Sequence, residues 1–140
     1  MVFPTIRIAP PIEKIYQRLG YRRDITRITP QQEQWIDRYI DEARALIHLQ
    51  GTMRRLPIIN REKGVLILGD NLRLVSRNLE TFLRDCDEAL IMGATAGESV
   101  MAAIRSDIAT DDATRAVVFD ATASEMADGA LDWHMDYIRR

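Results

Sequence analysis

The chain has 140 residues, of which 46% are hydrophobic and 29% are charged, and its formal net charge is -2. A chain of this length and composition buries a core large enough to need no disulfide or metal. No apolar run approaches the ~20 residues of a membrane-spanning helix, and the N-terminus shows no signal-sequence pattern. We therefore expect a cytoplasmic protein with no membrane partner.

The basic residues argue against nucleic-acid binding. Of the 19 basic residues, only Lys14 and Lys63 are lysines. The arginines include scattered pairs at 22–23, 54–55 and 139–140, with acidic residues between them. Nucleic-acid sites need a concentrated positive face, often interleaved with aromatic residues. The pattern instead indicates a mixed, solvated surface and no nucleic-acid partner.

The N-terminal segment is predicted to be an arm followed by a short helix. Residues 1–10 contain two prolines and no helical period, which favours an extended arm ahead of a single domain over 11–140. The apolar residues within 12–19 fall on one face of a helix. Gly20 ends this helix.

A second helix has clear start signals. Thr29 is placed as an N-cap, Pro30 as the first helical residue and Gln32 as the partner in a capping box. The apolar residues that follow keep a spacing of three and four. The spacing predicts a helix that continues to about Gln50 and ends at Gly51.

The next region changes period. Two short runs rich in β-branched and apolar residues, at 56–60 and 65–68, flank a four-residue turn at 61–64 and predict a hairpin. Apolar spacing then predicts a helix over 72–83, capped by one of the two polar residues before it. The lone Cys86 is interpreted as a small core residue, because no histidine or metal-ligand partner lies near it in sequence.

The last third predicts a strand and two helices. The run at 89–92 is apolar throughout, which is typical of a strand covered on both faces. A helix is predicted to start at Gly97. The final helix is predicted to begin with Thr110 as N-cap and with Asp111 and Asp112 in its first turn, and to extend for about 28 residues.

The final helix carries a stripe of small residues that an acid interrupts. Side chains at spacings of three and four form this stripe: Ala113, Ala116, Asp120, Ala123, Ala127 and Ala130. A buried, unpaired carboxylate is costly, so Asp120 must be hydrogen-bonded or face a cavity. The favoured interpretation is that Asp120 braces the turn at 93–97; a ligand contact is the alternative.

The turn "GATAG" at 93–97 is interpreted in two ways. A helix N-terminus offers free N–H groups for an anion, so the turn is a potential ligand cradle. It is not a G-x-G-x-x-G motif, it lacks a phosphate-binding lysine, and Glu98 adds negative charge, all of which favour a plain tight corner. The candidate ligand-binding residues are Thr95, Gly97, Asp120 and Ser124. No catalytic or metal-binding residue is predicted.

Three segments resemble the activation-domain family of cobalamin-dependent methionine synthase, in particular its small stand-alone members. They are "YQRLGYRR" at 16–23, "SRNLETFLRDCDEALIMGATAGESVMAAIRS" at 76–106 and "RAVVFDATASEMADGALDWHMDYI" at 115–138. The segments keep their order and a similar spacing between Ile12 and Ile138. The resemblance implies an α+β fold, with a twisted, mostly antiparallel sheet packed against helices and a long C-terminal helix.

The resemblance also implies a biochemical setting. In the family, the full domain binds S-adenosylmethionine and docks on a corrinoid-carrying domain. An oxidised cobalt is then reduced by a donor such as flavodoxin and remethylated from S-adenosylmethionine; the chemistry belongs to the cofactor. The family's Arg, Pro and Gly-Tyr signature for S-adenosylmethionine lies beyond the last helix, and this sequence ends at Arg140. We therefore expect no cofactor to be bound by this chain alone, and any S-adenosylmethionine site to be completed by another chain.

Two functions are compatible with these patterns. The first is an accessory domain that docks on a corrinoid protein or methyltransferase, which carries the cobalamin, and supports its reactivation. The alternative is a non-catalytic interaction or oligomerisation module that keeps the fold without binding S-adenosylmethionine. The stripe of small residues indicates a homo-oligomer formed through the last helix as one form of this alternative.

Overall fold

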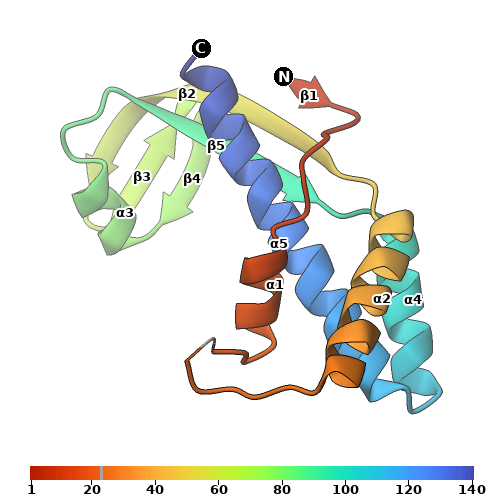
Figure 1. Ribbon diagram of the computed structural model, residues 1–140. Helices are drawn as coiled ribbons and strands as arrows, with labels where there is room; N and C mark the ends of the chain where they lie inside the picture. Colours follow the sequence, from red (N-terminus) through yellow and green to blue (C-terminus); the bar gives the residue numbers. More distant parts are fainter. Residues whose placement is uncertain (23) are drawn as a thin grey trace. The chain divides into compact units, whose positions relative to one another are not determined.

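The computed structural model describes residues 1–22 and 24–140; Arg23, one of the paired arginines, lies outside them. An antiparallel sheet and a long C-terminal helix confirm the predicted α+β class (Figure 1). The elements in chain order are β1 (Val2–Phe3), α1 (Ile12–Arg18), α2 (Pro30–Leu46), β2 (Gln50–Glu62), β3 (Val65–Leu68), a 3-10 turn (Gly69–Asn71), β4 (Leu72–Val75), α3 (Arg77–Phe82), β5 (Glu88–Thr95), α4 (Glu98–Ala109) and α5 (Ala113–Ile138).

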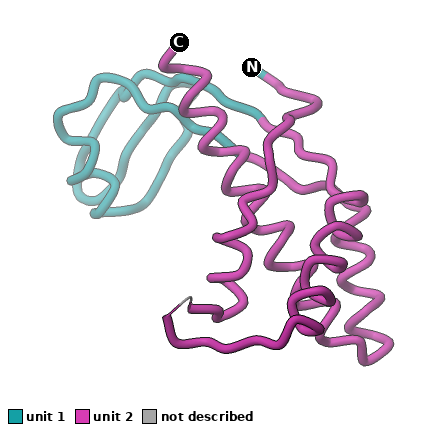
Figure 2. Tube along the Cα trace, viewed as in Figure 1, with its two compact units in different colours: residues 1, 52–93 teal, residues 2–51, 94–140 magenta. Residues whose placement is uncertain are grey.

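The chain divides into two compact units (Figure 2). Unit 1 comprises residue 1 and residues 52–93, and unit 2 comprises residues 2–51 and 94–140. Unit 1 contains β3, β4, α3 and most of β2 and β5. Unit 2 contains the other four helices. In the sheet, β2 pairs with β1, β3 and β5, and β3 pairs with β4.

Unit 2 is organised around α5, which packs against α1, α2 and α4 (Figure 1). Two clusters of buried side chains hold these helices together. The larger cluster is Ile6, Ala43, Leu49, Ala96, Val100, Ile104, Phe119, Ala123, Met126 and Ala130. The smaller is Ile15, Tyr16, Ile40, Val118 and Ala121. The buried side chains therefore lie on more than one side of α5.

The start of α2 follows the prediction and its end does not. The Thr29 hydroxyl accepts from the Gln32 N–H at 3.2 Å, and the Gln32 side chain accepts from the Thr29 N–H at 2.9 Å, which completes the capping box. The helix ends at Leu46, four residues before Gln50. The reason is tertiary, because the His48 N–H donates to the Ala96 carbonyl at 2.8 Å and so holds this segment in an extended conformation.

Unit 1 is built on a hairpin whose turn is tighter than predicted. Glu62 pairs with Val65, which leaves Lys63 and Gly64 as a two-residue turn. Both have positive φ, 53° and 79° respectively, as a type I′ turn requires. Glycine adopts this conformation freely, whereas lysine does not. The core of unit 1 consists of Leu56, Leu66, Leu68 and Ala89.

The helix predicted over 72–83 is wrong in its first half. Asp70 and Asn71 have φ of 58° and 62°, and they turn the chain back so that β4 pairs with β3. The apolar residues of β4 satisfy a helical and an extended pattern equally well, and pairing with β3 decides between them. The helix α3 begins only after Ser76, whose hydroxyl accepts from the Leu79 N–H at 3.2 Å.

The strand predicted before Gly97 is present as β5, but it is not covered on both faces. Ala89 is buried, Leu90 and Met92 are half-buried, and Ile91 is 37% exposed. The expectation of full coverage is therefore wrong. A continuous apolar run shows only that the strand has few polar side chains. It does not specify whether one face or both faces of the strand are covered.

The final helix is long, as predicted, but its start is displaced. The N-cap of α5 is Asp112, which accepts from the Arg115 N–H at 3.3 Å, whereas Thr110 ends α4. Asp111 lies between the two helices with φ of 58°. α5 has 26 residues. Neither it nor any other helix in the described residues combines the length and apolarity that crossing a bilayer requires.

Candidate functional site

The corner at 93–97 joins β5 to α4, and its polar groups are already engaged. The Gly97 N–H donates to the Thr95 hydroxyl at 3.1 Å, so these two polar groups are paired within the corner. Gly97 has φ of 91°, and a Cβ there would lie 3.1 Å from the His48 carbonyl oxygen. The backbone of the corner is therefore packed closely against the chain that leaves α2. These contacts favour the tight-corner interpretation over a ligand cradle.

The other two candidate contacts, Asp120 and Ser124, lie on α5. Asp120 is exposed and Ser124, one turn later, is half-buried. In the described residues, no hydrogen bond joins either of them to Thr95 or Gly97. The prediction that Asp120 braces the corner is wrong, because α5 turns it towards solvent while Ala123 and its neighbours face inwards. The candidate residues thus form two separate pairs, one at the corner and one on α5.

The stripe of small residues is used inside unit 2. Ala116, Ala123 and Ala130 are 5%, 5% and 0% exposed, and the last two belong to the larger cluster. Small side chains at seven-residue spacing let a neighbouring helix approach α5 closely. This part of the stripe is consequently covered by the chain itself and does not offer a free face to a second copy.

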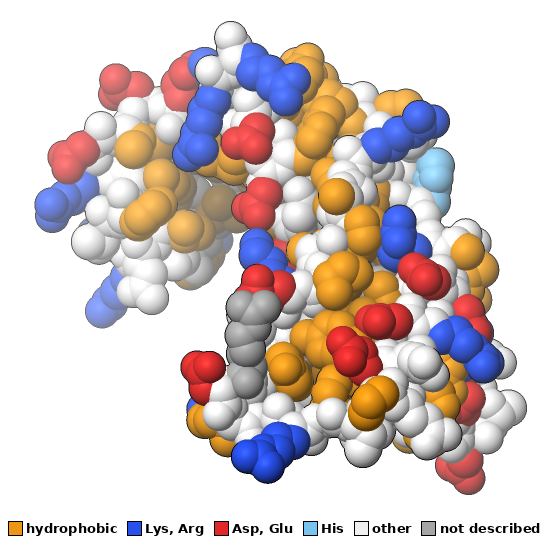
Figure 3. Space-filling view, viewed as in Figure 1, with side chains coloured by type: hydrophobic (Ala, Val, Ile, Leu, Met, Phe, Trp, Pro, Cys, Tyr) orange, Lys and Arg blue, Asp and Glu red, His pale blue; other side chains and the backbone are white. Residues whose placement is uncertain are grey.

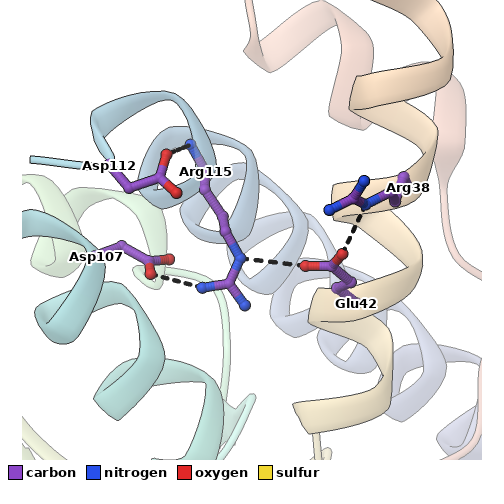
Figure 4. Close-up of polar contacts among 5 residues, drawn as sticks. All are labelled: Arg38, Glu42, Asp107, Asp112 and Arg115. Carbon is purple, nitrogen blue, oxygen red and sulfur yellow. Dashed lines mark hydrogen bonds and ion pairs between the residues drawn. The ribbon is translucent and has the colours of Figure 1, made fainter. Parts of the chain in front are cut away.

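A partly buried ion-pair network ties three helices of unit 2 together (Figure 4). The Arg115 guanidinium donates from Nη1 to Asp107 Oδ1 at 2.6 Å and from Nε to Glu42 Oε2 at 3.1 Å. It also lies 4.2 Å from the centroid of the Phe119 ring. On the other side of Glu42, Arg38 Nε donates to Oε1 at 2.9 Å. One guanidinium therefore links α2, α4 and α5.

The electrostatics of this network suit a structural role. The hydrogen bond from Arg38, with that from Arg115, lowers the pKa of Glu42, so this carboxylate stays ionised. Asp107 is 6% exposed and its second oxygen has no hydrogen-bond partner among the described residues. Glu42, whose pKa is lowered by its two guanidinium partners, is poorly suited to exchange protons at neutral pH.

The sequence carried one signal for this network. Arg115 stands in the first turn of α5, where the positive end of the helix dipole disfavours a cation. Such a residue is expected to have carboxylate partners elsewhere. Its two partners, Glu42 and Asp107, could not be named from sequence, because Glu42 is 73 residues away.

A second polar network connects α1 to the rest of unit 2. Arg18 Nε donates to Glu125 Oε1 at 2.7 Å, and Nη2 donates to Asp128 Oδ2 at 3.2 Å. The Tyr16 hydroxyl donates to Asp37 Oδ1 at 2.7 Å. Burial, together with this hydrogen bond, raises the pKa of Tyr16 above its ordinary value. These contacts hold α1 against α5 and α2.

His134 is fully buried near the C-terminal end of α5 and has no polar partner for either ring nitrogen among the described residues. Its ring lies 5.1 Å from the Phe3 ring and 5.6 Å from the Trp133 ring, between centroids. It also lies directly against Gly51, where a side chain would overlap it. Burial lowers the pKa of His134. The imidazole is therefore held neutral as part of an aromatic core.

The aromatic end of α5 is part core and part surface. Trp133 is half-buried and packs against the larger cluster, whereas Tyr137 is 41% exposed. Their rings stack with centroids 5.5 Å apart. Trp133 therefore belongs to the core, whereas Tyr137 forms an exposed edge beside it.

An open pocket of about 1080 Å³ lies within unit 2, beside α1 and the start of α2. Its lining includes Tyr16, Tyr21, Arg22, Arg27 and Glu33. Its lining contains both acidic and basic side chains, so its charge selects no single class of ligand. In the described residues, no group of three or more His, Cys, Asp or Glu side chains has an arrangement that could hold a metal ion.

The surface charges are interspersed on the face that Figure 3 shows. Lys and Arg side chains are separated by acidic and other side chains and form no continuous band there (Figure 3). Hydrophobic side chains gather on the viewed surface of unit 1 (Figure 3). The exposed large apolar residues of this unit are Met1, Ile59, Leu72, Val75, Leu79, Phe82 and Ile91.

Comparison of the sequence with models of protein families and with curated proteins gives no match. The resemblance to the activation-domain family therefore rests on the three segments quoted above.

Proposed function

We propose that this chain is a cytoplasmic accessory module of a corrinoid methyltransferase system, which docks on the corrinoid-carrying protein and supports its reactivation. The chemistry in question is the remethylation of an oxidised corrinoid. The cobalt takes one electron from a donor protein and a methyl group from S-adenosylmethionine. The rest of the methyl donor is released as S-adenosylhomocysteine. The chain itself would supply placement and a contact surface, and the partner would carry the cobalamin.

The observation that carries this proposal is that the first and third resembling segments, and residues 94–106 of the second, meet in unit 2, where Val100 and Ile104 share a cluster with Phe119. The segment at 16–23 contributes Arg18, which bonds to Glu125 in the segment at 115–138. The third segment returns Arg115 to Asp107, next to the end of the segment at 76–106. Segments that share a likeness and also interlock are expected if the likeness reflects a common fold.

The position of the candidate residues suggests how a partner would be contacted. Asp120 is exposed on α5, and Ser124, one turn later, is half-buried, so both are at least partly accessible to another protein. Thr95 and Gly97 are engaged with each other at the corner. We therefore assign the docking contact to the surface of α5 around Asp120 and Ser124, and any contact from Thr95 to S-adenosylmethionine to a site that the partner completes.

The first experiment measures docking. The probe is the cobalamin-loaded corrinoid domain of a cobalamin-dependent methionine synthase, and its visible absorbance is followed by sedimentation velocity with and without this chain. We expect the absorbance to sediment faster in the mixture. The double variant Asp120→Arg, Ser124→Arg should abolish the shift. A matched control, Asp41→Arg, changes a carboxylate that is 73% exposed on α2 and should leave the shift intact.

The second experiment measures S-adenosylmethionine binding by calorimetry, for the chain alone, the corrinoid domain alone and the mixture. Heat that appears only in the mixture supports a site completed by the partner. Docking without any such heat would favour the alternative, a non-catalytic interaction module. The absence of both docking and heat would exclude the proposed function.

A further inference from the structure

The sheet ends at β4, which lies entirely within unit 1. In the described residues β4 pairs with β3 alone, and both strands belong to the range 52–93. Arg73 is exposed, and Val75 is 73% exposed. An edge strand carries a row of backbone N–H and C=O groups that the sheet does not use, and such a row can pair with another strand.

Two hydrogen bonds, one at each end of β4, show which of its backbone groups face β3. At the start, the Leu72 N–H donates to the carbonyl of Gly69, which directly follows β3. Beyond the other end, the Ser76 N–H donates at 2.8 Å to the carbonyl of Gly64, which directly precedes β3. Because backbone groups alternate between the two edges of a strand, positions 72, 74 and 76 face β3. Both bonds give the same alternation.

The N–H and C=O groups of Arg73 and Val75 consequently point towards the outer edge, and no other hydrogen bond engages them in the described residues. The two side chains share one face of the sheet, because side chains two positions apart lie on the same side of a strand. The residues opposite them on β3 are Ile67 and Val65, and both are half-buried. This edge therefore offers the backbone groups of two residues beside three apolar side chains and one guanidinium.

The charges of unit 1 leave this edge basic. In the described residues, the side chains of Arg73 and Arg77 make no ion pair or hydrogen bond, whereas every other basic side chain of unit 1 does. Asp87 is the one acidic side chain of the unit without such a partner. The engaged acidic residues are Glu62, Asp70, Glu80, Asp85 and Glu88. Charge complementarity therefore favours a partner that brings a carboxylate to β4.

We propose that the outer edge of β4 binds an extended segment of another protein as an additional antiparallel strand, with a carboxylate opposite Arg73 and an apolar side chain opposite Val75. In this register each of the two residues exchanges a pair of hydrogen bonds with the residue opposite it. The backbone bonds supply the affinity, and the two side chains select the sequence. This surface belongs to unit 1, so the proposal does not depend on the docking contact on α5.

The first test uses a short synthetic peptide that carries a fluorescent dye, alternates valine with threonine and has a glutamate in place of its central valine. Its binding to the full chain is measured by fluorescence anisotropy. We expect half-saturation at about 100 μM, because β4 has only four residues. The same peptide with lysine in place of glutamate should bind about fivefold more weakly.

Two results of this titration would overturn the proposal. The first is the absence of saturable binding of either peptide up to about 1 mM of the chain. The second is a chain that self-associates in sedimentation equilibrium and binds neither peptide, which would assign the edge to a second copy. Equal affinity for the two peptides would contradict the contact to Arg73.

The charge contact is tested with Arg73→Glu, which should reverse the order of the two peptides, so that the lysine peptide binds more tightly. The matched control is Arg84→Glu, which changes an arginine of the same unit whose side chain is 73% exposed. We expect this control to keep the original order. A reversal in both variants would assign the preference to the net charge of the chain and contradict the register.

The backbone contact is tested by amide hydrogen exchange, measured for individual residues by NMR. Saturation with the glutamate peptide should slow exchange at Arg73 and Val75 by at least about tenfold. The Leu72 N–H, which is already bonded to Gly69, should change little. Bound peptide without slower exchange at Arg73 and Val75 would contradict strand addition.

Val75→Pro tests the same contact by mutation. Proline at this position removes an N–H of the outer edge and none that faces β3, so the strand can still form. We expect the glutamate peptide to bind about tenfold more weakly, with the thermal unfolding midpoint little changed. Unchanged affinity in a folded variant would contradict the proposal. The exchange measurement uses the native chain, so the test does not depend on this variant folding.

Discussion

The two buried clusters of unit 2 contain ten and five side chains, whereas the cluster of unit 1 contains four. The ion-paired side chains of unit 2 are also less exposed than those of unit 1. In unit 2, the Arg115 and Asp107 side chains are 28% and 8% exposed. In unit 1, the paired Arg54 and Asp70 side chains are 65% and 66% exposed. Exposed pairs contribute little to stability, so unit 1 depends on its hairpin geometry and strand ladder. Unit 2 combines a larger core with partly buried ion pairs.

The largest expected effect is the loss of unfolding free energy when a core side chain is truncated, tested once in each unit. Phe119→Ala removes a fully buried side chain and should lower the free energy of unfolding by about 3–5 kcal/mol. Leu66→Ala makes the equivalent change in unit 1, at a cost of about 2–5 kcal/mol. Hydrogen exchange should show loss of protection mainly in 94–140 for the first variant and in 52–93 for the second. Equal loss in both regions would mean that the units unfold as one.

The next effect tests the ion-pair network of unit 2. Arg115→Met leaves Asp107 buried without its donor and should cost about 2–3 kcal/mol, measured by urea unfolding. Arg38→Met removes the other arginine on Glu42 and is the matched control, because its side chain is 71% exposed. We expect this control to unfold close to the native chain. A similar loss of unfolding free energy in both variants would show that burial does not strengthen these ion pairs.

A pH effect is expected from His134, which belongs to unit 2. Burial lowers its pKa from the ordinary value of 6.5, so the unfolded chain binds a proton more readily than the folded one. Stability from this group is therefore complete above pH 6.5 and falls as the pH drops towards the lowered pKa, by up to about 1.4 kcal/mol per pH unit. His134→Leu should make the free energy of unfolding less dependent on pH between 7 and 5, by urea titration. An unchanged pH dependence in His134→Leu would contradict the assignment of this effect to His134.

The smallest effect concerns the hairpin turn of unit 1. Lys63 has φ of 53°, a conformation that asparagine adopts more readily. Lys63→Asn should raise the thermal midpoint slightly, equivalent to about 0.5 kcal/mol. Lys63→Val, with a β-branched side chain, should lower it by about 1–2 kcal/mol. Opposite signs from two changes at one exposed position would isolate the backbone as the cause. Equal shifts would contradict the turn geometry.

The prediction for Asp120 shows the limit of reasoning from one stripe. The spacing of three and four placed Asp120 among alanines that are buried, yet α5 is buried over a wide arc that also includes Val118 and Ala121. The boundary of that arc depends on where α1, α2 and α4 lie. A periodic pattern identifies a helix and one inward direction, but it does not fix how far burial extends to either side.

The sequence alone determined the local features of this protein. Thr29 with Gln32, Gly20 and Gly97 set helix ends because their hydrogen bonds and φ angles involve only residues a few positions away. The hairpin at 61–64 followed from the same kind of short-range signal, but its turn is shorter than predicted because Glu62 pairs with Val65. The tertiary structure alone decided that β4 is a strand, that α2 stops at Leu46 and that Arg115 meets Glu42. Each of these depends on a partner distant in sequence, and an apolar or charged residue does not specify which distant partner it will meet.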